Sequence, residues 1–267
     1  MKEKCGRETY LTKNRWDDCD LDQGGCFAWL HTWKAAPTHT VAGLQELYQQ
    51  LLPTRVYYHR KTGTGGSDER CRLCGKTPEC VGHILAGCSA LVQTQYLTRH
   101  NNALKILFFE MLRSLDLVTT TAPWYTLAVP KPVYESDRAV AYWDIPLYAE
   151  TTYVRANRID ATIINKQSKE IILLEMSCPW IENREAKSSD KTTKYGPLRW
   201  ELQQRYPGYR VTQHNIIIDV LGGYSQDLTN SLKLLVGTRY RSVLAQMQRS
   251  VITSSLHIAR SFKVVTK

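Results

Sequence analysis

The chain has 267 residues, of which 43% are hydrophobic and 10% aromatic, a composition typical of globular proteins that excludes a disordered chain. No stretch approaches about 18 consecutive apolar residues and the first residues form no apolar signal core, so we expect no membrane partner and no secretory leader. The formal net charge of +10 favours a polyanionic partner, although basic proteins without one are also common.

Residues 1–62 are predicted to form an N-terminal helical region. Leucine and tyrosine side chains recur at helical spacing after Pro37, and Pro53 ends this helix. Cys19, Cys26 and His31 fit no standard metal spacing, so packed thiols are expected there in preference to a metal site. The glycine-rich stretch at 63–68 predicts a flexible linker.

Four residues of the next segment, 68–118, have the spacing of a CCHC zinc knuckle. They are Cys71, Cys74, His83 and Cys88, in the pattern Cys-x2-Cys-x8-His-x4-Cys. Four protein ligands complete a tetrahedral shell and leave no open position, so the predicted Zn²⁺ is structural. The eight cysteines are expected in a reducing compartment, nuclear or cytoplasmic, where clusters favour metal over disulfides.

A long amphipathic helix is predicted over residues 96–117, because its apolar side chains recur on one face. Arg99 and His100 lie in the first part of this helix. Two interpretations stay open for the pair: a contact with nucleic-acid phosphates, or a helix face that is exposed to water. Three prolines or turn breaks between 119 and 132 mark a boundary before the next segment.

Residues 133–236 are predicted to hold a core that is centred on a β-hairpin. Two apolar, β-branched runs, 161–164 and 171–174, flank a polar connection. The Gly-Pro pair at 196–197 predicts a helix break. Beyond it, the nearly continuous apolar run at 211–220 predicts a buried strand, and two helices are expected to follow.

The predicted hairpin brings two acidic residues together. A hairpin centred between Gln167 and Ser168 places Asp160 opposite Glu175, with Cβ atoms about 5 Å apart on one face. Two carboxylates at that distance repel each other unless a cation lies between them, and their oxygens are ligands that suit Mg²⁺. The alternative, which pattern alone favours, is a core hairpin with an acidic residue at each rim position.

A charged helix is predicted over 182–195. Lys187, Lys191 and Tyr195 are spaced four apart and therefore share one face of this helix. Metal-assisted phosphodiester cleavage needs a lysine beside two metal-binding carboxylates, because the ammonium group stabilises developing charge or orients the attacking water. A solvated helix face is the alternative interpretation.

Several motifs of this region resemble the restriction-like endonuclease domain at the C-terminus of site-specific non-LTR retrotransposon reverse transcriptases, which belongs to the PD-(D/E)xK nuclease class. The motifs are 156–160, 174–179, Lys191-x-x-Lys194-Tyr195 and Leu198-x-x-Glu201, with the CCHC zinc knuckle upstream. Isoleucine stands at 159 where the family has proline, and Glu175 stands where it usually has aspartate. Ser177 occupies the lysine position of ordinary PD-(D/E)xK nucleases, whereas the retrotransposon subfamily places its lysine on the following helix, as Lys191 does.

The resemblance implies an α+β fold: a PD-(D/E)xK restriction-endonuclease-like core, with a mixed sheet flanked by helices, preceded by a helical region with one CCHC zinc knuckle. Residues 237–267 are expected to form a C-terminal helix. The implied activity is a metal-dependent DNA endonuclease that nicks target DNA for target-primed reverse transcription. The alternative is a catalytically decayed nucleic-acid-binding zinc module from the same element.

The resemblance also assigns roles to individual residues. Asp160 and Glu175 would hold catalytic Mg²⁺, Lys191 would assist the attacking water, and Tyr195 would orient the water or the phosphate. The expected nucleic-acid contacts are Arg99, His100, Arg158, Lys187 and Lys194. The expected partners are target DNA and element RNA, and no small-molecule cofactor is expected.

Overall fold

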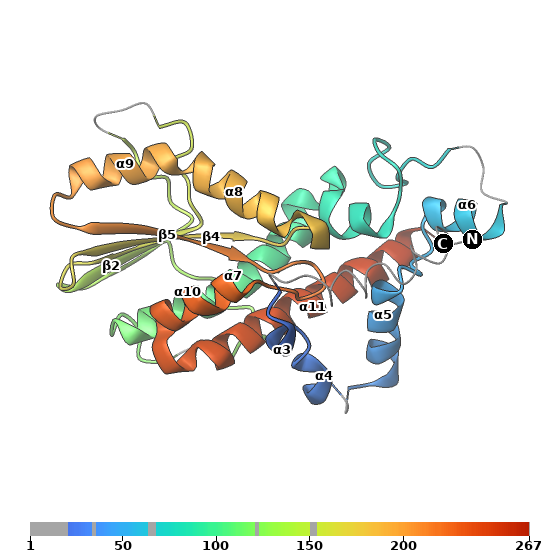
Figure 1. Cartoon of the computed structure of the whole chain (residues 1–267), viewed down its shortest axis with the longest axis horizontal. Helices are drawn as coiled ribbons and strands as arrows, with labels where there is room; N and C mark the ends of the chain where they lie inside the picture. Colours follow the sequence, from blue (N-terminus) through green and yellow to red (C-terminus); the bar gives the residue numbers. More distant parts are fainter. Residues whose placement is uncertain (1–20, 34–35, 64–67, 121–122, 150–153, 267) are drawn as a thin grey trace.

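A computed structural model describes residues 21–33, 36–63, 68–120, 123–149 and 154–266 of the chain. Its centre is one five-stranded sheet with the strand order β1-β2-β3-β4-β5 (Figure 1). Strands β1 to β4 are antiparallel neighbours, and β5 is parallel to β4. The bounds are β1 Val133–Glu135, β2 Ala139–Trp143, β3 Ala161–Asn165, β4 Glu170–Ser177 and β5 Arg210–Ile217. The prediction of an α+β fold with a mixed sheet flanked by helices is therefore confirmed.

The central hairpin has the register that the sequence predicts. Ala161 pairs with Leu174 at its open end, and Asn165 pairs with Glu170 beside the turn. The side chain of Asn165 accepts hydrogen bonds from the backbone N–H groups of residues 167 and 168, at 3.0 and 3.1 Å, which is how an asparagine fixes a tight turn. One step beyond the pairing of Ala161 with Leu174, this register leads to residues 160 and 175.

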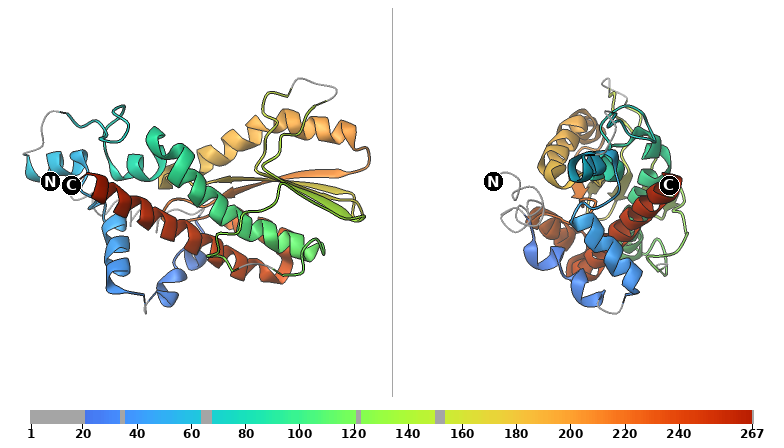
Figure 2. Two further views of the ribbon diagram at one scale, coloured as in Figure 1. Left: turned by 180° about the vertical axis from the view of Figure 1, so that it is seen from behind. Right: turned by 90° about the vertical axis from the view of Figure 1, so that its right-hand side faces the viewer.

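Helices cover both faces of the sheet. On one face lie α8 (Arg184–Lys194) and α9 (Gly196–Arg205), and on the other lie α7 (Leu97–Ser114), α10 (Gln226–Val236) and α11 (Tyr240–Val265) (Figures 1 and 2). The strands are apolar on both sides, as a covered sheet requires. Ile171 and Leu173 pack beneath α8 and α9, whereas Leu174 and Met176 pack against α7 and α11.

The predicted helix break at 196–197 is present, because α8 ends at Lys194 and Pro197 lies in the first turn of α9. The remaining short helices are α3 Gln23–Cys26, α4 Trp29–Thr32, α5 Thr38–Tyr48, α6 Arg55–Thr62, the π-helices η1 His83–Gly87 and η3 Val92–Tyr96, and the 3₁₀ turns η2 Ser89–Leu91, η4 Ile181–Asn183 and η5 Gly237–Arg239.

A second apolar core joins the N-terminal helices to the zinc-knuckle segment. It contains Trp29 and Leu47 from the N-terminal region and Ile84 and Leu85 from η1. Helix α11 belongs to both cores: its first half packs along α7 against the sheet, and its second half crosses the N-terminal core (Figure 2). None of the helices in the described ranges is long and apolar enough to cross a membrane.

Residues 1–20 lie outside the described residues. They include Cys19, one of the three residues Cys19, Cys26 and His31 that were considered as metal ligands. Cys26 is fully buried, and its sulfur lies 3.3 Å from the carbonyl oxygen and 3.2 Å from the backbone nitrogen of Tyr224. His31 is exposed. The expectation of a packed thiol is therefore confirmed for Cys26.

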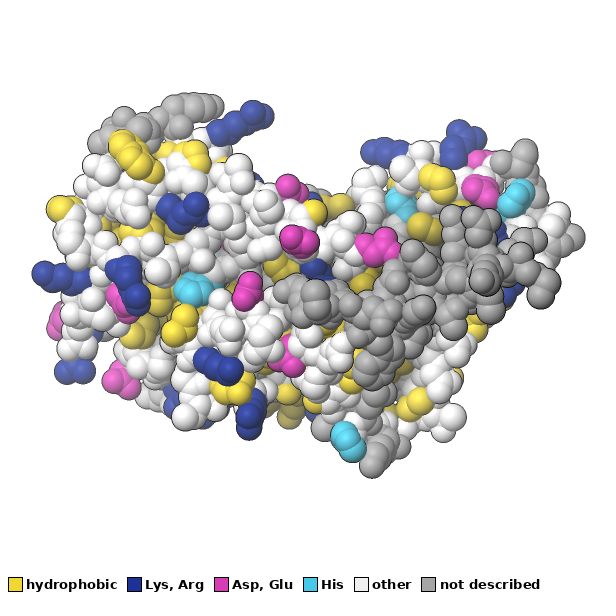
Figure 3. All heavy atoms as spheres, viewed as in Figure 1, with side chains coloured by type: hydrophobic (Ala, Val, Ile, Leu, Met, Phe, Trp, Pro, Cys, Tyr) yellow, Lys and Arg dark blue, Asp and Glu magenta, His cyan; other side chains and the backbone are white. Residues whose placement is uncertain are grey.

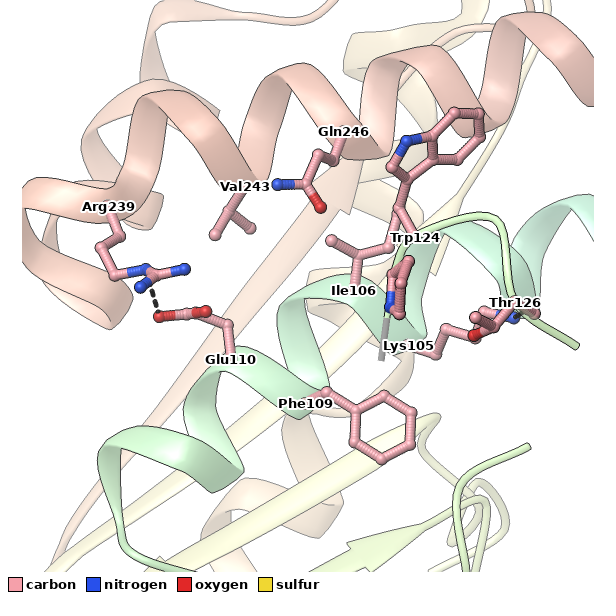
Figure 4. Close-up of a pocket in the computed structure, with 10 residues that line it drawn as sticks. Lys105, Ile106, Phe109, Glu110, Trp124, Thr126, Arg239, Val243 and Gln246 are labelled. Atoms are coloured by element: carbon pink, nitrogen blue, oxygen red, sulfur yellow. Dashed lines mark hydrogen bonds and ion pairs between the residues drawn. The ribbon is translucent and has the colours of Figure 1, made fainter. Parts of the chain in front are cut away.

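A small cavity lies between α7, α11 and residues 123–126 (Figure 4). Its volume of about 40 Å³ holds water molecules and excludes a larger ligand. An ion pair between Glu110 and Arg239, 2.7 Å long, lies on one side, and Lys105 donates a 2.5 Å hydrogen bond to the carbonyl of Thr126 on the other. These contacts give the cavity a structural role.

Candidate functional site

The open end of the central hairpin carries the two predicted carboxylates. Asp160 immediately precedes β3, and Glu175 lies in β4 on the face that α8 and α9 cover. Oδ2 of Asp160 accepts a 2.7 Å hydrogen bond from the backbone N–H of Met176, which ties the first acid to the strand of the second. The side chain of Glu175 is only 2% exposed, whereas that of Asp160 is 22% exposed. The site is therefore a buried acid beside a partly accessible one.

Helix α8 brings the predicted lysine to this pair. Nζ of Lys191 donates a hydrogen bond to Oε1 of Glu175 and forms an ion pair with it. A side-chain bond from Gln213 in β5 to the carbonyl of Lys191, 3.1 Å long, fixes this turn of α8 against the sheet. The other oxygen of Glu175, Oε2, is buried and has no hydrogen-bond partner among the described residues. One carboxylate oxygen is thus left for a further ligand.

His100 lies at this site as well, which the sequence did not indicate. Its Nε2 is 2.9 Å from Oδ2 of Asp160, and its Nδ1 is 2.8 Å from Oδ1 of Asn101. Both ring nitrogens face acceptors, which suits a protonated imidazole that donates twice. The phosphate contact of His100 stays a prediction, and in this structure the ring is bonded to Asp160.

The charges of the site act on one another. Burial lowers the pKa of His100, but the hydrogen bond and charge of Asp160 outweigh it and raise that pKa to about 9. Burial works against the ionised form of Asp160, yet His100 and the Met176 N–H bring its pKa below the usual value. Burial and the charge of Asp160 raise the pKa of Glu175, against the opposing effect of Lys191. The two carboxylates repel, and two cations compensate.

These residues fit a hard divalent cation such as Mg²⁺. One or two carboxylates hold Mg²⁺ in many proteins, and water and substrate phosphate supply the remaining oxygens. The buried, unpartnered Oε2 of Glu175 and its repulsion by Asp160 are the observations that support the fit. Within the described residues, however, the zinc-knuckle cluster is the one place where three or more metal-binding side chains converge.

Tyr195 is shielded from solvent under the junction of α8 and α9, where it is 1% exposed. Its hydroxyl donates a 2.9 Å hydrogen bond to the carbonyl of Arg158 and accepts one of 2.9 Å from Nζ of Lys194. Burial, followed by the charges of Glu175 and Asp160, raises the pKa of Tyr195. In this structure Tyr195 therefore positions the segment that leads into Asp160.

The remaining predicted nucleic-acid contacts differ in their surroundings. Arg158 is exposed and forms two 2.7 Å bonds to the carboxylate of Asp144. Lys187 is exposed and its Nζ lies 3.8 Å from Oδ2 of Asp190. Among the described residues, no bond joins Lys187 to the acidic pair. Lys194 is exposed beside Tyr195. Lys191, Lys194 and Arg158 therefore surround the site, and Lys187 lies apart from it.

Arg99 is buried, which corrects its predicted contact with phosphate. The residue is 2% exposed, and its guanidinium donates to the carbonyl of Leu85 at 2.8 Å, to Oγ of Ser255 at 3.3 Å and to the carbonyl of Cys178 at 3.4 Å. These three partners lie in η1, in α11 and just after β4. Arg99 thus joins the zinc-knuckle segment to the C-terminal helix and to the sheet.

The four predicted zinc ligands converge. Their ligand atoms all lie within 4.8 Å of one another, so this Cys₃His cluster could hold a zinc ion. Sγ of Cys71 is 3.9 Å from Sγ of Cys88, and Sγ of Cys74 is 3.3 Å from Nε2 of His83. Tetrahedral zinc would separate two sulfurs by about 3.8 Å, and a sulfur and a nitrogen by about 3.6 Å. The cluster therefore has the dimensions of a zinc site.

The local structure explains why these residues meet. Gly75 has a φ of +66°, and its N–H bonds the carbonyl of Cys71 at 2.7 Å, which closes the turn that carries the first two thiols. Oγ1 of Thr77 lies 2.9 Å from Nδ1 of His83 and leaves Nε2 to face the sulfurs. Cys80, which lies between Cys74 and His83 in the sequence, is exposed and lies outside the cluster.

Burial raises the pKa of Cys71, and it raises that of Cys88 to about 12. For Cys74 burial acts in the same direction, but hydrogen bonds from the backbone of Lys76 and from His83 lower its pKa to about 6. A divalent ion would stabilise all three thiolates at once. The described cysteines form no disulfide.

Comparison with known proteins gives no family for this chain. No family model matches it, and no curated protein is similar to it in sequence. Among the solved structures that match is an N-terminal domain of a reptarenavirus L protein, with 13% sequence identity over 86% of this chain and 98% of that chain, at a TM-score of 0.29. A TM-score this low carries no argument about fold or function.

Proposed function

We propose that the chain is a metal-dependent DNA endonuclease of the PD-(D/E)xK type, derived from the C-terminal region of a site-specific non-LTR retrotransposon protein. The observation that carries the proposal is the meeting of Asp160, Glu175 and Lys191 at one end of the hairpin, with one buried carboxylate oxygen unpartnered. The motif resemblance supplies the class, and the geometry supplies the chemistry. Nicking of target DNA before reverse transcription is the biological role that the resemblance implies.

Each residue has a distinct part in the proposed reaction. Asp160 and Glu175 would hold Mg²⁺, which when bound supplies an activated water and neutralises phosphate charge. Lys191 lies on the buried carboxylate, where its ammonium group stabilises negative charge that develops on the phosphate. Tyr195 acts as a positioning residue, because its hydroxyl holds the backbone of Arg158 two residues before Asp160.

The test is nicking of supercoiled plasmid DNA by the purified full chain in the presence of added Mg²⁺. Asp160→Asn and Lys191→Met should each reduce the rate by at least about 100-fold, since each removes a group that acts at the reacting phosphate. Asp190→Asn is a matched control, because Asp190 is exposed on the same helix as Lys191 and lies away from the pair. Unchanged nicking by Asp160→Asn would remove the acidic pair from the mechanism.

A second candidate function is a nucleic-acid-binding zinc module without catalysis. It is favoured by the cation partners that both carboxylates already have, and by the convergence of metal ligands at the Cys₃His cluster. Calorimetric titration with Mg²⁺ separates the candidates. Heat that appears with wild type and disappears with Asp160→Asn supports the nuclease, whereas salt-dependent DNA binding with no Mg²⁺ heat and no nicking supports the binding module.

A further inference from the structure

A basic cleft opens beside the acidic pair. Its volume is about 540 Å³, and it is lined by Arg155, Ala156, Asn157, Arg158, Lys194 and Pro197. Three of these side chains are cationic and none is acidic. On the face shown in Figure 3, by contrast, Lys and Arg side chains are scattered among acidic ones and form no continuous patch. The cleft is therefore a local concentration of positive charge next to the candidate site.

The cations of the cleft are available to an anionic ligand. Lys194 contacts the hydroxyl and ring of Tyr195, and neither Lys194 nor the exposed Arg155 has an ion-pair partner among the residues that the structure describes. Arg158 pairs with Asp144, but the two side chains are 60% and 47% exposed. Such surface pairs contribute little to stability, so phosphate can replace the carboxylate at small cost.

The lining of the cleft is close to the carboxylate pair along the chain. Arg158 lies two residues before Asp160, and Lys194 lies one turn of helix after Lys191. The hydroxyl of Tyr195 contacts both walls, because it bonds the carbonyl of Arg158 and Nζ of Lys194. A phosphodiester chain that occupies the cleft would therefore lie near the acidic pair.

An exposed aromatic side chain continues the same helix face. Trp200 lies three residues after Pro197 in α9, which places the two on one side of the helix, and Trp200 is 47% exposed. Unpaired bases stack on exposed aromatic rings beside a positively charged groove, in a manner that tolerates any base sequence. Paired bases in a duplex offer no free face of this kind.

We propose that this cleft binds the sugar-phosphate backbone of a single DNA strand, and that Trp200 stacks on a base beyond it. A volume near 540 Å³ is in the range of about 300–1,000 Å³ that is usual for ligand sites. The choice of DNA rests on the proposed function, whereas binding itself needs no cleavage. The site would therefore act on unpaired DNA in preference to intact duplex.

Fluorescence anisotropy with the full chain tests this proposal. The probes are a labelled single strand of about 12 nucleotides, the matching duplex and the matching RNA strand. Divalent metal is not added and no chelator is used, so that zinc stays bound and DNA is not cut. We expect wild type to bind single-stranded DNA at least about tenfold more tightly than duplex, with an affinity that falls as salt is raised.

Three variants separate charge from stacking. Arg155→Ala and Lys194→Ala should each weaken single-strand binding several-fold and reduce the slope of log K against log salt by about 0.7. Trp200→Ala should weaken binding about tenfold without changing that slope, and Trp200→Phe should restore most of it. Arg138→Ala is the matched control, since Arg138 is an exposed arginine in the β1–β2 turn, at the opposite end of the sheet. Melting temperatures equal to wild type show that each variant is folded.

The proposal is overturned if duplex binds as tightly as single strand, if the Arg155 and Lys194 variants keep the wild-type salt slope, or if Arg138→Ala has the same effect as they do. RNA that binds more than about tenfold tighter than DNA would overturn the choice of DNA. A protein that binds single strands through these residues but never nicks DNA would contradict the proposed nuclease and leave this inference standing.

Discussion

Replacing His100 with asparagine is expected to change how the stability of the Mg²⁺-free protein depends on pH. His100 lies 2.9 Å from Asp160, and although burial lowers its pKa, that neighbour raises it from 6.5 to about 9. A histidine whose pKa rises on folding stabilises the folded state fully below its unfolded pKa. This stabilisation is lost as the pH rises through the folded pKa.

The size of the effect follows from the two pKa values. Each tenfold change in proton affinity corresponds to about 1.4 kcal/mol, so a rise from 6.5 to about 9 contributes about 3 kcal/mol. The free energy of unfolding of wild type, measured relative to the His100→Asn variant, should therefore fall by about 3 kcal/mol between about pH 6 and about pH 10. Asparagine suits the comparison because its amide can still donate to Asp160 while it carries no charge.

The assay is urea unfolding followed by circular dichroism at a series of pH values, with zinc bound and without added Mg²⁺. Subtracting the variant from wild type removes the titration of groups that do not interact with His100, including the zinc-binding cysteines. Two curves that run parallel across this pH range would show that His100 does not carry a raised pKa. The reasoning from the short contact between the ring and Asp160 would then be wrong.

Three further results are expected. Arg99→Met should lower the free energy of unfolding by about 2–6 kcal/mol, because two backbone carbonyls lose their donor at about 1–3 kcal/mol each. The exposed Arg158→Met should change the free energy of unfolding by less than about 1 kcal/mol. Equal values for the two variants in urea unfolding would contradict the structural role of Arg99. Glu175→Gln should raise the melting temperature of the Mg²⁺-free, zinc-bound protein at pH 7 and abolish nicking. The reason is that burial and the charge of Asp160 raise the pKa of Glu175 and make its ionised form destabilising. Cys88→Ser should lose the single zinc measured by atomic absorption and melt about 10 °C or more below wild type, whereas Cys80→Ser should keep both properties.

The local parts of the fold could be predicted from the sequence. The hairpin register follows from two apolar runs and a short polar turn, so the opposition of Asp160 and Glu175 needs no information from the rest of the chain. The zinc ligands follow from spacing alone. The contact of Lys191 with Glu175 could also be predicted, because α8 follows the hairpin directly in the sequence.

Contacts between distant segments could not be predicted in this way. His100 meets Asp160 across 60 positions of sequence, and no spacing rule connects them. Arg99 was expected to meet solvent or phosphate, because a charged residue in an amphipathic helix normally lies on its wet face. Helix α7 is instead buried around most of its circumference, and the buried residues include Arg99, Lys105 and Glu110, each of which has polar partners. Tertiary packing decides such positions.

The path of α11 has a consequence for the synthesis of the protein. Residues 240–265 supply side chains to the core beneath the sheet and to the core around the zinc cluster, so neither core is complete before they leave the ribosome. The hairpin and the zinc knuckle are synthesised earlier, and their apolar surfaces stay exposed until residues 240–265 have been made. The nascent chain should therefore depend on chaperones until its last helix docks, and loss of that helix should expose both cores together.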